Sequence, residues 1–282
     1  MIPDNTTNYL YLADTLPKKY PTFYERFEKI LKECKIDFRF LPNTKDVWAV
    51  DYMPIQVRDN HFVQFVYDPD YLKPKKYRNT ISDVDSICRK IAMMPVKSGI
   101  VLDGGNVTRS VNKVIMTDKI FKENPGIEER QLIKDLQNLF EVDKLFFVPK
   151  DPADFTGHAD GMVRFVDEDT VLINKYQANY EPQFQLSLRM ALHNAGLEYI
   201  EIPYCPDLSS SDSAKGCYMN YLQMKDVIII PTFGIEEDDI TVKQLEDIFK
   251  GQTIKTIDGN DLAAQGGILN CISWNIKKGI AE

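Results

Sequence analysis

A repeat of about 55 residues is the feature that most limits what this chain can fold into. Five segments each join two short apolar or alternating runs through a polar turn, which is the pattern of a β-hairpin. They begin at residues 51, 105, 161, 218 and 267, about 50 to 57 residues apart. A repeat that is overlooked leads to the wrong fold class, so it is considered before any local pattern. The spacing predicts five similar units.

The stretches between the hairpins also follow one order. Each has helical spacing of apolar residues and then a short extended run, beginning with FYERFEKILKECK followed by IDFRFLP. We therefore expect five units of helix, strand and hairpin. The last hairpin runs out of chain near Lys278, and we predict that residues 8–14 supply its missing strand. Such closure predicts one α/β domain over residues 1–282, although any α/β protein alternates helices and strands, and that alternative stays open.

Composition restricts the partners and the location of the protein. With 282 residues, of which 44% are hydrophobic, the chain can bury a substantial core. No run approaches the roughly 18 apolar residues of a membrane span, and no export signal is visible at the N-terminus, so we expect a cytoplasmic protein that does not bind membranes.

The pattern of cysteines and the net charge further restrict the classes of ligand and partner that the protein can bind. The five cysteines are scattered and form no CxxC pair, which argues against disulfides and zinc, and we predict no metal and no cofactor. A net charge of −8 argues against nucleic acid and favours a small cationic ligand. Whether the chain forms a homo-oligomer is left open.

Polar residues recur at one point of the units, where the first strand ends. They are Asp51 after Trp48 in the first unit, Asp103 before Gly104, Gly105 and Asn106 in the second, His158 and Asp160 in the third, and Cys271 in the fifth. The fourth unit offers no obvious catalyst. If the units surround an axis, these side chains face a common centre. His158 and Asp160 are two residues apart, and on an extended strand they would share a face.

One thiol, one imidazole and several carboxylates suit a nucleophile with a proton-transfer partner better than a metal site. Paired carboxylates match the rigid N–H fork of a guanidinium, whereas the developing anion of an acyl substrate would be opposed by them. Taken singly, Cys271 could be a small core residue, His158 a buried hydrogen-bonded histidine, and Trp48 part of the core.

Four motifs, DVWAVDYMP, LDGGN, GHADGMVRFVD and GGILNCISW, resemble the agmatine deiminase and bacterial peptidyl-arginine deiminase family. Its members are guanidino-group modifying enzymes with the pentein fold, a five-bladed α/β propeller. The resemblance covers nearly the whole chain in the family's motif order. Val50 and Met53 depart from it, because the family usually has arginine and glycine there.

The resemblance implies a role for each matching residue. Cys271 corresponds to the nucleophile and His158 to the general acid and base, while Asp160 and Asp51 correspond to the carboxylates that grip the guanidinium. Asp103 stands where the family has an acidic residue, and we count it with the catalytic group. We also expect Trp48 and Asn106 to contact the substrate, and Arg109 to meet a substrate carboxylate if there is one.

The implied reaction is hydrolysis of a guanidino compound to a ureido product and ammonia through a thiouronium on Cys271. Agmatine leads as substrate because its second ammonium suits an acidic protein, which would place the enzyme in polyamine biosynthesis. Arginine and peptidyl-arginine stay as alternatives. The rival interpretations are a pentein that binds a ligand without catalysis, and amidino transfer to an amine instead of water.

Overall fold

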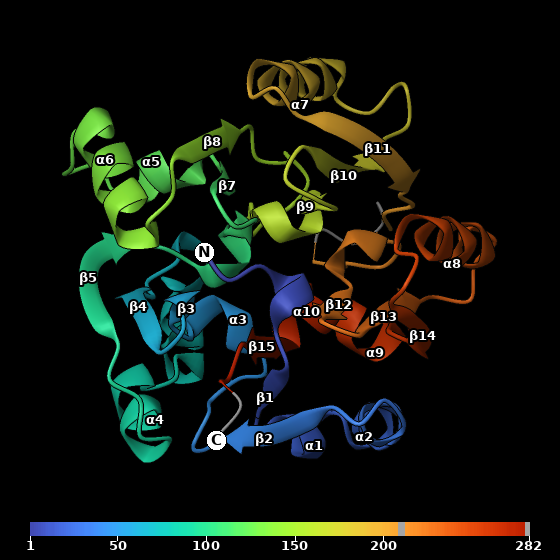
Figure 1. Cartoon of the computed structure of the whole chain (residues 1–282), viewed down its shortest axis with the longest axis horizontal. Helices are drawn as coiled ribbons and strands as arrows, with labels where there is room; N and C mark the ends of the chain where they lie inside the picture. The colour runs from blue at the N-terminus through green and yellow to red at the C-terminus, as the bar shows by residue number, and fades with distance from the viewer. Residues whose placement is uncertain (208–211, 280–282) are drawn as a thin grey trace.

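The computed structural model describes residues 1–207 and 212–279, and its strands form five three-stranded sheets. The sheets stand around a common centre with the longer helices on the outside (Figure 1). The predicted five-bladed α/β propeller is therefore confirmed. The expected loop at residues 207–216 lies partly outside the described residues, since 208–211 are not among them.

Each blade combines the two strands of a hairpin with a third strand that runs parallel to the hairpin's second strand. The first four blades are β3 Ile55–Arg58, β4 His61–Val66 and β5 Val96–Val101; β6 Thr108–Arg109, β7 Lys113–Thr117 and β8 Lys144–Val148; β9 Val163–Phe165, β10 Thr170–Lys175 and β11 Glu198–Pro203; and β12 Leu222–Met224, β13 Val227–Thr232 and β14 Thr253–Asp258.

The fifth blade joins the two ends of the chain, as predicted. It contains β15 Ser273–Ile276, β1 Tyr9–Ala13 and β2 Asp37–Leu41. Strand β1 pairs antiparallel with β15 and parallel with β2. The expected order within a unit was wrong in one respect: the strand after each helix belongs to the preceding hairpin. The reason is that a parallel partner needs a helical crossover, so the helix and its following strand complete the blade already begun.

The helices between the second and third strands cover the outer side of the ring. They include α2 Pro21–Glu33, α4 Val84–Lys90, α6 Glu129–Phe140, α7 Pro182–Asn194 and α8 Glu237–Ile248, with shorter turns α1 Leu16–Lys19 and α5 Lys119–Glu123. A further short turn, α9 Asn260–Ala263, follows β14 and leads to the fifth blade. In α6 the buried residues Leu132, Leu136 and Phe140 recur every four positions, which gives one apolar face. The central strands are almost wholly buried, as Val227–Thr232 illustrates.

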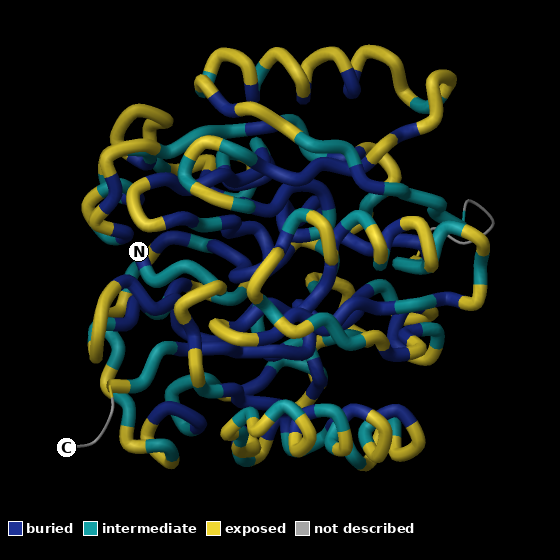
Figure 2. Tube along the Cα trace, turned by 45° about the vertical axis from the view of Figure 1, so that its right-hand side comes forward, coloured by how far each residue is buried: buried dark blue, intermediate teal, exposed yellow. Residues whose placement is uncertain are grey.

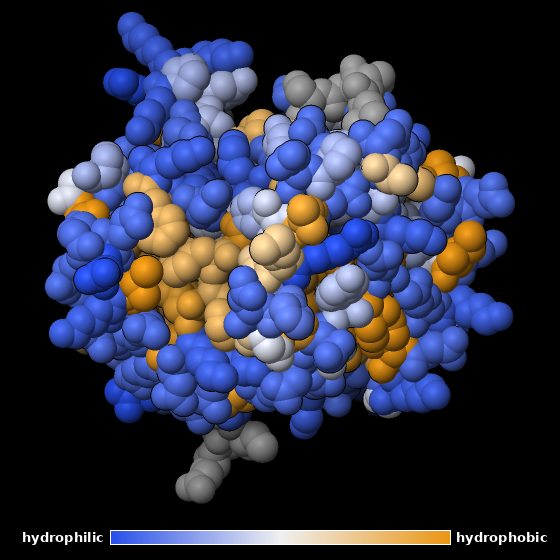
Figure 3. Space-filling model, turned by 90° about the horizontal axis from the view of Figure 1, so that it is seen from above, coloured by the Kyte–Doolittle hydropathy of each residue, from blue (hydrophilic) through white to orange (hydrophobic). Residues whose placement is uncertain are grey.

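Burial increases from the outer helices toward the centre of the ring (Figure 2). Hydrophilic side chains cover most of the side nearest α7, where an apolar area interrupts them (Figure 3). Helix α7 carries two large apolar residues that are more than half exposed, Leu186 and Met190. Within residues 1–207 and 212–279, no helix combines the length and the apolar character needed to cross a membrane.

Candidate active site

Five single helical turns line the centre of the ring, one before the first strand of each hairpin. They are α3 Ala49–Tyr52, η4 Gly104–Asn106, η5 Ala159–Gly161, η6 Tyr218–Asn220 and α10 Leu269–Ile272. Each turn contacts the next, and α10 contacts α3, so the turns themselves form a closed ring. The repeat seen in the sequence therefore brings one short segment from every blade to the same place.

The apolar residues around Cys271 favour a strand. In the structure, however, Cys271 lies in the helical turn α10. The turn forms because the side chain of Asn220 caps it from the neighbouring blade. Its Oδ1 accepts hydrogen bonds from the backbone N–H groups of Ile268, Asn270 and Cys271, at 3.2, 3.1 and 3.3 Å. Strand β15 begins only after this turn.

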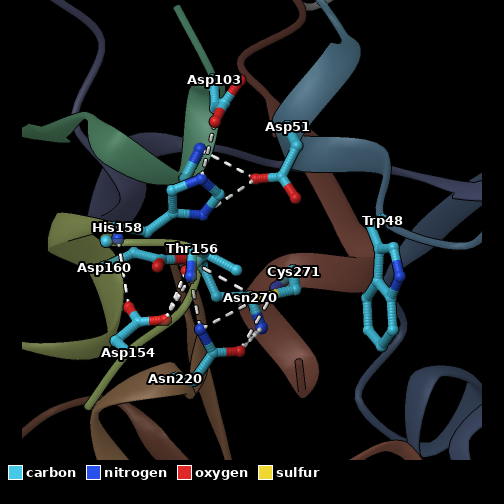
Figure 4. Close-up of polar contacts among 12 residues, drawn as sticks. Trp48, Asp51, Asp103, Asp154, Thr156, His158, Asp160, Asn220, Asn270 and Cys271 are labelled. Carbon is cyan, nitrogen blue, oxygen red and sulfur yellow. Dashed lines mark hydrogen bonds and ion pairs between the residues drawn. The ribbon is translucent and has the colours of Figure 1, made fainter. Parts of the chain in front are cut away.

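Asn220 and Asp160, which come from two other blades, lie beside Cys271 (Figure 4). Nδ2 of Asn220 lies 3.2 Å from Sγ, and Oδ2 of Asp160 lies 3.9 Å from it. The same oxygen of Asp160 accepts hydrogen bonds from the amides of Asn270 at 2.6 Å and Asn220 at 3.2 Å. Two amides thus hold the Asp160 carboxylate beside the thiol.

His158 is held between two carboxylates in the same view (Figure 4). Its Nε2 lies 2.9 Å from Oδ2 of Asp103, and its Nδ1 lies 3.5 Å from Oδ1 of Asp51. The expected strand through His158 and Asp160 was wrong, because His158 directly precedes the turn η5, which contains Asp160. The backbone N–H of His158 donates to Oδ2 of Asp154 at 3.1 Å and is fixed by it.

Burial and neighbouring charge set the ionisation of these groups. Burial lowers the pKa of His158, but the Asp51 carboxylate and the hydrogen bond to Asp103 outweigh it and raise that pKa to about 9. Burial raises the pKa of Asp51 to about 7. Burial would also raise the pKa of Asp103, yet the bond to His158 and the ammonium of Lys119 bring it below its usual value. The imidazole is therefore protonated at neutral pH.

The thiol has the opposite tendency. Burial, followed by the nearby Asp160 and Asp51 carboxylates, raises the pKa of Cys271 well above its usual value. Burial raises the pKa of Asp160 as well. The site at rest is therefore a neutral thiol beside carboxylates, and a cation placed among them would reverse the electrostatic penalty on the thiolate.

Aromatic rings border this cluster of polar side chains. A methyl group at Gly267 would lie 2.6 Å from the Trp48 ring and 3.0 Å from Cβ of Cys271, so the ring stands against the Cys271 turn. Tyr71 lies across from His158, with ring centroids 5.9 Å apart, and also contacts Phe155 at 5.6 Å. Tyr71 and Phe155 come from the segments 67–82 and 149–157.

Two residues predicted to contact the substrate, Asn106 and Arg109, have polar partners within the protein. Asn106 accepts a hydrogen bond from the backbone N–H of Thr117 at 2.9 Å, which ties its blade together. Arg109 pairs with Asp4 at 2.8 Å, and Arg164 pairs with the same carboxylate at 2.7 Å. Asp4 thus pairs with both arginines.

The two departures from the family motif have different surroundings. Met53 is buried in an apolar cluster with Tyr52 and Trp274. The carbonyl of Val50 approaches the neighbouring turn so closely that a methyl group at Gly104 would lie 2.0 Å from it. Glycine at this position therefore allows α3 and η4 to pack.

Sequence reasoning missed Asn220, which contacts the thiol, the carboxylate and the backbone of α10 at once. The repeat could have found it, because Asn220 ends the central turn of the fourth blade, the one unit for which no catalyst was predicted. It also missed Asn270 and Lys119, which hold Asp160 and Asp103. Within the described ranges, no group of three His, Cys, Asp or Glu residues is arranged to hold a metal ion.

Known proteins resemble this chain in sequence and in fold. Relatives from two Mycoplasma species, provisionally named agmatine deiminases, are 23% identical over 226 residues, or 67% of this chain. The alignments span only 62% of the relatives' own length. An agmatine deiminase of Medicago truncatula is 23% identical over 228 residues, which is 70% of this chain and 60% of that protein.

The solved structure of C. jejuni agmatine deiminase superimposes with a TM-score of 0.82 at 19% identity, covering 99% of this chain and 96% of that one. The fold is thus the pentein propeller. Residues 18–276 match the profile of the Porphyromonas-type peptidyl-arginine deiminases. On this match, which takes in almost the entire ring of blades, the chain belongs to the Porphyromonas-type peptidyl-arginine deiminase family.

Proposed function

We propose that the protein hydrolyses a guanidino compound to a ureido compound and ammonia, with Cys271 as nucleophile and agmatine as the foremost substrate. The observation that carries this proposal is the pairing of two clusters at the centre of the ring. One holds the Cys271 thiol against Asp160, and the other holds His158 between Asp51 and Asp103.

The carboxylates of Asp51 and Asp160 would bind the guanidinium. In the described residues, no hydrogen bond uses Oδ2 of Asp51 or Oδ1 of Asp160, so each carboxylate keeps an oxygen for a ligand. A guanidinium offers its N–H donors in one plane and can bridge two such groups. The central carbon of the bound cation would then face the sulfur that lies beside Asp160.

Binding of the cation would also activate the thiol. The two carboxylates that raise the pKa of Cys271 are the ones that the guanidinium would neutralise. Their neutralisation lets the thiol lose its proton to solvent, and Nδ2 of Asn220, 3.2 Å from Sγ, donates to the resulting thiolate. The nucleophile would therefore form only when substrate is present.

The thiolate then forms a bond to the guanidinium carbon, giving a tetrahedral adduct. His158 donates its proton to one nitrogen, and the C–N bond breaks. Ammonia departs, and a thiouronium remains on Cys271. Neutral His158 next takes a proton from water, whose oxygen bonds to the same carbon. The C–S bond breaks as the hydroxyl proton of this second adduct passes to solvent, and the ureido product leaves with the thiolate restored.

Agmatine is the first candidate because curated relatives carry that name and because the net charge of −8 favours a dication. A free arginine site would need a cation for the carboxylate, and both Arg109 and Arg164 are engaged by Asp4. Agmatine needs no such partner.

One feature favours arginine at the C-terminus of a peptide as a second candidate. Tyr71, whose ring faces His158, is followed in the same segment by exposed Lys73, Lys75 and Lys76. Three ammonium groups on this segment would attract a carboxylate at the far end of the substrate. The family profile, named for peptidyl-arginine deiminases, agrees with such a substrate.

The test is a colorimetric ureido assay with agmatine, arginine, a peptide ending in free arginine, and the same peptide with an amidated end. We expect agmatine to give the highest kcat/KM, and Cys271→Ala to abolish turnover. Cys217→Ala is the matched control, because Cys217 is also a buried thiol in the central region. The absence of ureido product from all four compounds would refute the proposal.

Two rival functions have their own outcomes. A binding module without catalysis would leave Cys271 slow to react with a haloacetamidine, whereas a catalytic thiol is modified quickly and is protected by agmatine. Amidino transfer would give no ureido product, and would form a new guanidino compound only when an amine acceptor is added. Each of these two experiments uses the wild-type protein, with Cys271→Ala as the control.

A further inference from the structure

A buried lysine lies directly behind the candidate active site. Lys119, the first residue of α5, is only 3% exposed. Its ammonium lies 2.6 Å from Oδ2 of Asp103 and 3.1 Å from Oε1 of Glu123, and it stands over the ring of Tyr71 at 4.9 Å. Lysine is almost never fully buried unless it is paired, so this position needs an explanation.

The ammonium and the imidazole share one oxygen. Oδ2 of Asp103 contacts both Nζ of Lys119 and Nε2 of His158, while Oδ1 has no hydrogen-bond partner among the described residues. The orientation of this carboxylate is therefore set by the lysine on one side and the histidine on the other. A continuous series of ionisable groups runs from Glu123 through Lys119, Asp103 and His158 to Asp51.

Packing alone does not require a charge at this place. The stem of Lys119 lies along the backbone before His158, where a methyl group at Gly157 would be 3.5 Å from it. An apolar side chain of equal length could fill that space. It would, however, leave Asp103 and Glu123, whose side chains are 0% and 5% exposed, as two carboxylates without the cation between them.

We propose that Lys119 is a positioning residue of the active site: its ammonium fixes Asp103, which in turn holds His158 by Nε2 and keeps Nδ1 turned toward Asp51 and the substrate. The catalytic consequence rests on the proposed function, but the effect on His158 does not. Lys119 thereby also limits how tightly the imidazole holds its proton, because a second positive charge stands behind the same carboxylate.

Groups from several elements face this pair and have to be considered in any titration. Those that face His158 are Asp51 from α3, Asp103 before η4, Lys119 from α5, Asp160 from η5, and the ring of Tyr71. Those that face Lys119 are Asp103, Glu123 and Tyr71.

The first test is an NMR titration of the histidine rings in the free protein, which has only three histidines to resolve. Lys119→Met removes the ammonium and should raise the His158 midpoint by about one pH unit, because a like charge no longer opposes the imidazolium. Lys119→Arg keeps the charge and should leave the midpoint near the wild-type value. An unchanged or lower midpoint in folded Lys119→Met overturns the proposal.

Lys113→Met is the matched control. Lys113 is also buried and paired, with Asp169 at 2.7 Å, but its partners Glu168 and Asp169 lie in the turn between β9 and β10. This variant should lose stability without moving the His158 midpoint. A shift equal to that of Lys119→Met would mean that any buried lysine acts through general loosening, and the proposal would fail.

A measurement on the wild-type protein covers the case in which Lys119→Met does not fold. Because Lys119 and His158 share one oxygen of Asp103, the side-chain signals of Lys119 should move with the His158 midpoint. The signals of Lys113 should not. Lys119 signals that stay constant through the His158 titration would overturn the proposal without any variant.

The kinetic test separates this inference from the proposed function. With agmatine, Lys119→Met should reduce kcat at least about tenfold with KM nearly unchanged, and Lys119→Arg should recover part of the loss. A fall confined to KM contradicts a role through His158. If the wild-type chain turns over no guanidine at all, the proposed function fails, while the NMR titration still decides the role of Lys119.

Discussion

A single methyl group at Gly105 tests the geometry around His158 most sharply. Gly105 lies in the turn η4, and its N–H donates to Oδ1 of Asp51 at 3.1 Å. A methyl group there would lie 2.5 Å from that oxygen and 2.5 Å from Nδ1 of His158. Non-bonded heavy atoms are at their optimum near about 3.5 Å, so one or both groups must withdraw by about 1 Å.

That displacement acts on the catalytic step more than on the fold. A misplacement of about 1 Å can cost on the order of 100-fold in rate, whereas overpacking of a buried site typically costs about 1–3 kcal/mol of stability. Gly105 does not have a positive φ, so alanine adds no backbone strain. We therefore expect Gly105→Ala to fold and to lose about 100-fold in kcat/KM for agmatine.

The assay is ureido production at several agmatine concentrations, with thermal unfolding of the same sample to show that the variant is folded. Gly126→Ala is the control, because a methyl group there meets no atom within 4 Å and φ is not positive. It should match the wild type in both measurements. Gly105→Ala with wild-type kcat/KM would refute the assigned contact between Asp51 and His158.

Three further outcomes follow from the contacts described. Asn220→Ala leaves three N–H groups of α10 without their acceptor and should lower the free energy of unfolding by about 1–3 kcal/mol, measured in urea; equal stability would contradict the capping role. The pKa of His158 is raised from 6.5 to about 9, so its protonated imidazole stabilises the folded state. This contribution is complete below pH 6.5 and is lost as the pH rises through 9. Between pH 7 and 9 the wild type should thus lose about 2 kcal/mol more than His158→Gln, and parallel curves would argue against a protonated imidazole. Asp4→Ala leaves Arg109 and Arg164 without their shared anion, and we expect a loss of about 3 kcal/mol in urea unfolding, which an unchanged midpoint would disprove.

The blades could be predicted from the sequence because their signals are local. Alternating apolar residues, polar turns and helical spacing lie within single segments, and the repeat shows which segments are equivalent. The pairing of β1 with β15 also followed, since a hairpin strand at the end of the chain needs a partner. Which third strand joins which hairpin did not follow, because that depends on the crossover and not on the order of segments.

The site was harder to predict where distant residues decide the local structure. The apolar run around Cys271 favours a strand, yet Asn220, 51 residues earlier, supplies the oxygen that makes it a helical turn. Arg109 lies in the unit where a substrate contact was expected, but its partner Asp4 comes from the N-terminal segment, 105 residues earlier in the sequence. No local pattern contains either pairing.

The most direct test of the central claim is mass spectrometry of the protein quenched with acid during turnover of agmatine. The peptide that contains Cys271 should gain the mass of agmatine less ammonia, as expected for a thiouronium. Steady ureido production with an unmodified Cys271, or with the added mass on another cysteine, would contradict the account.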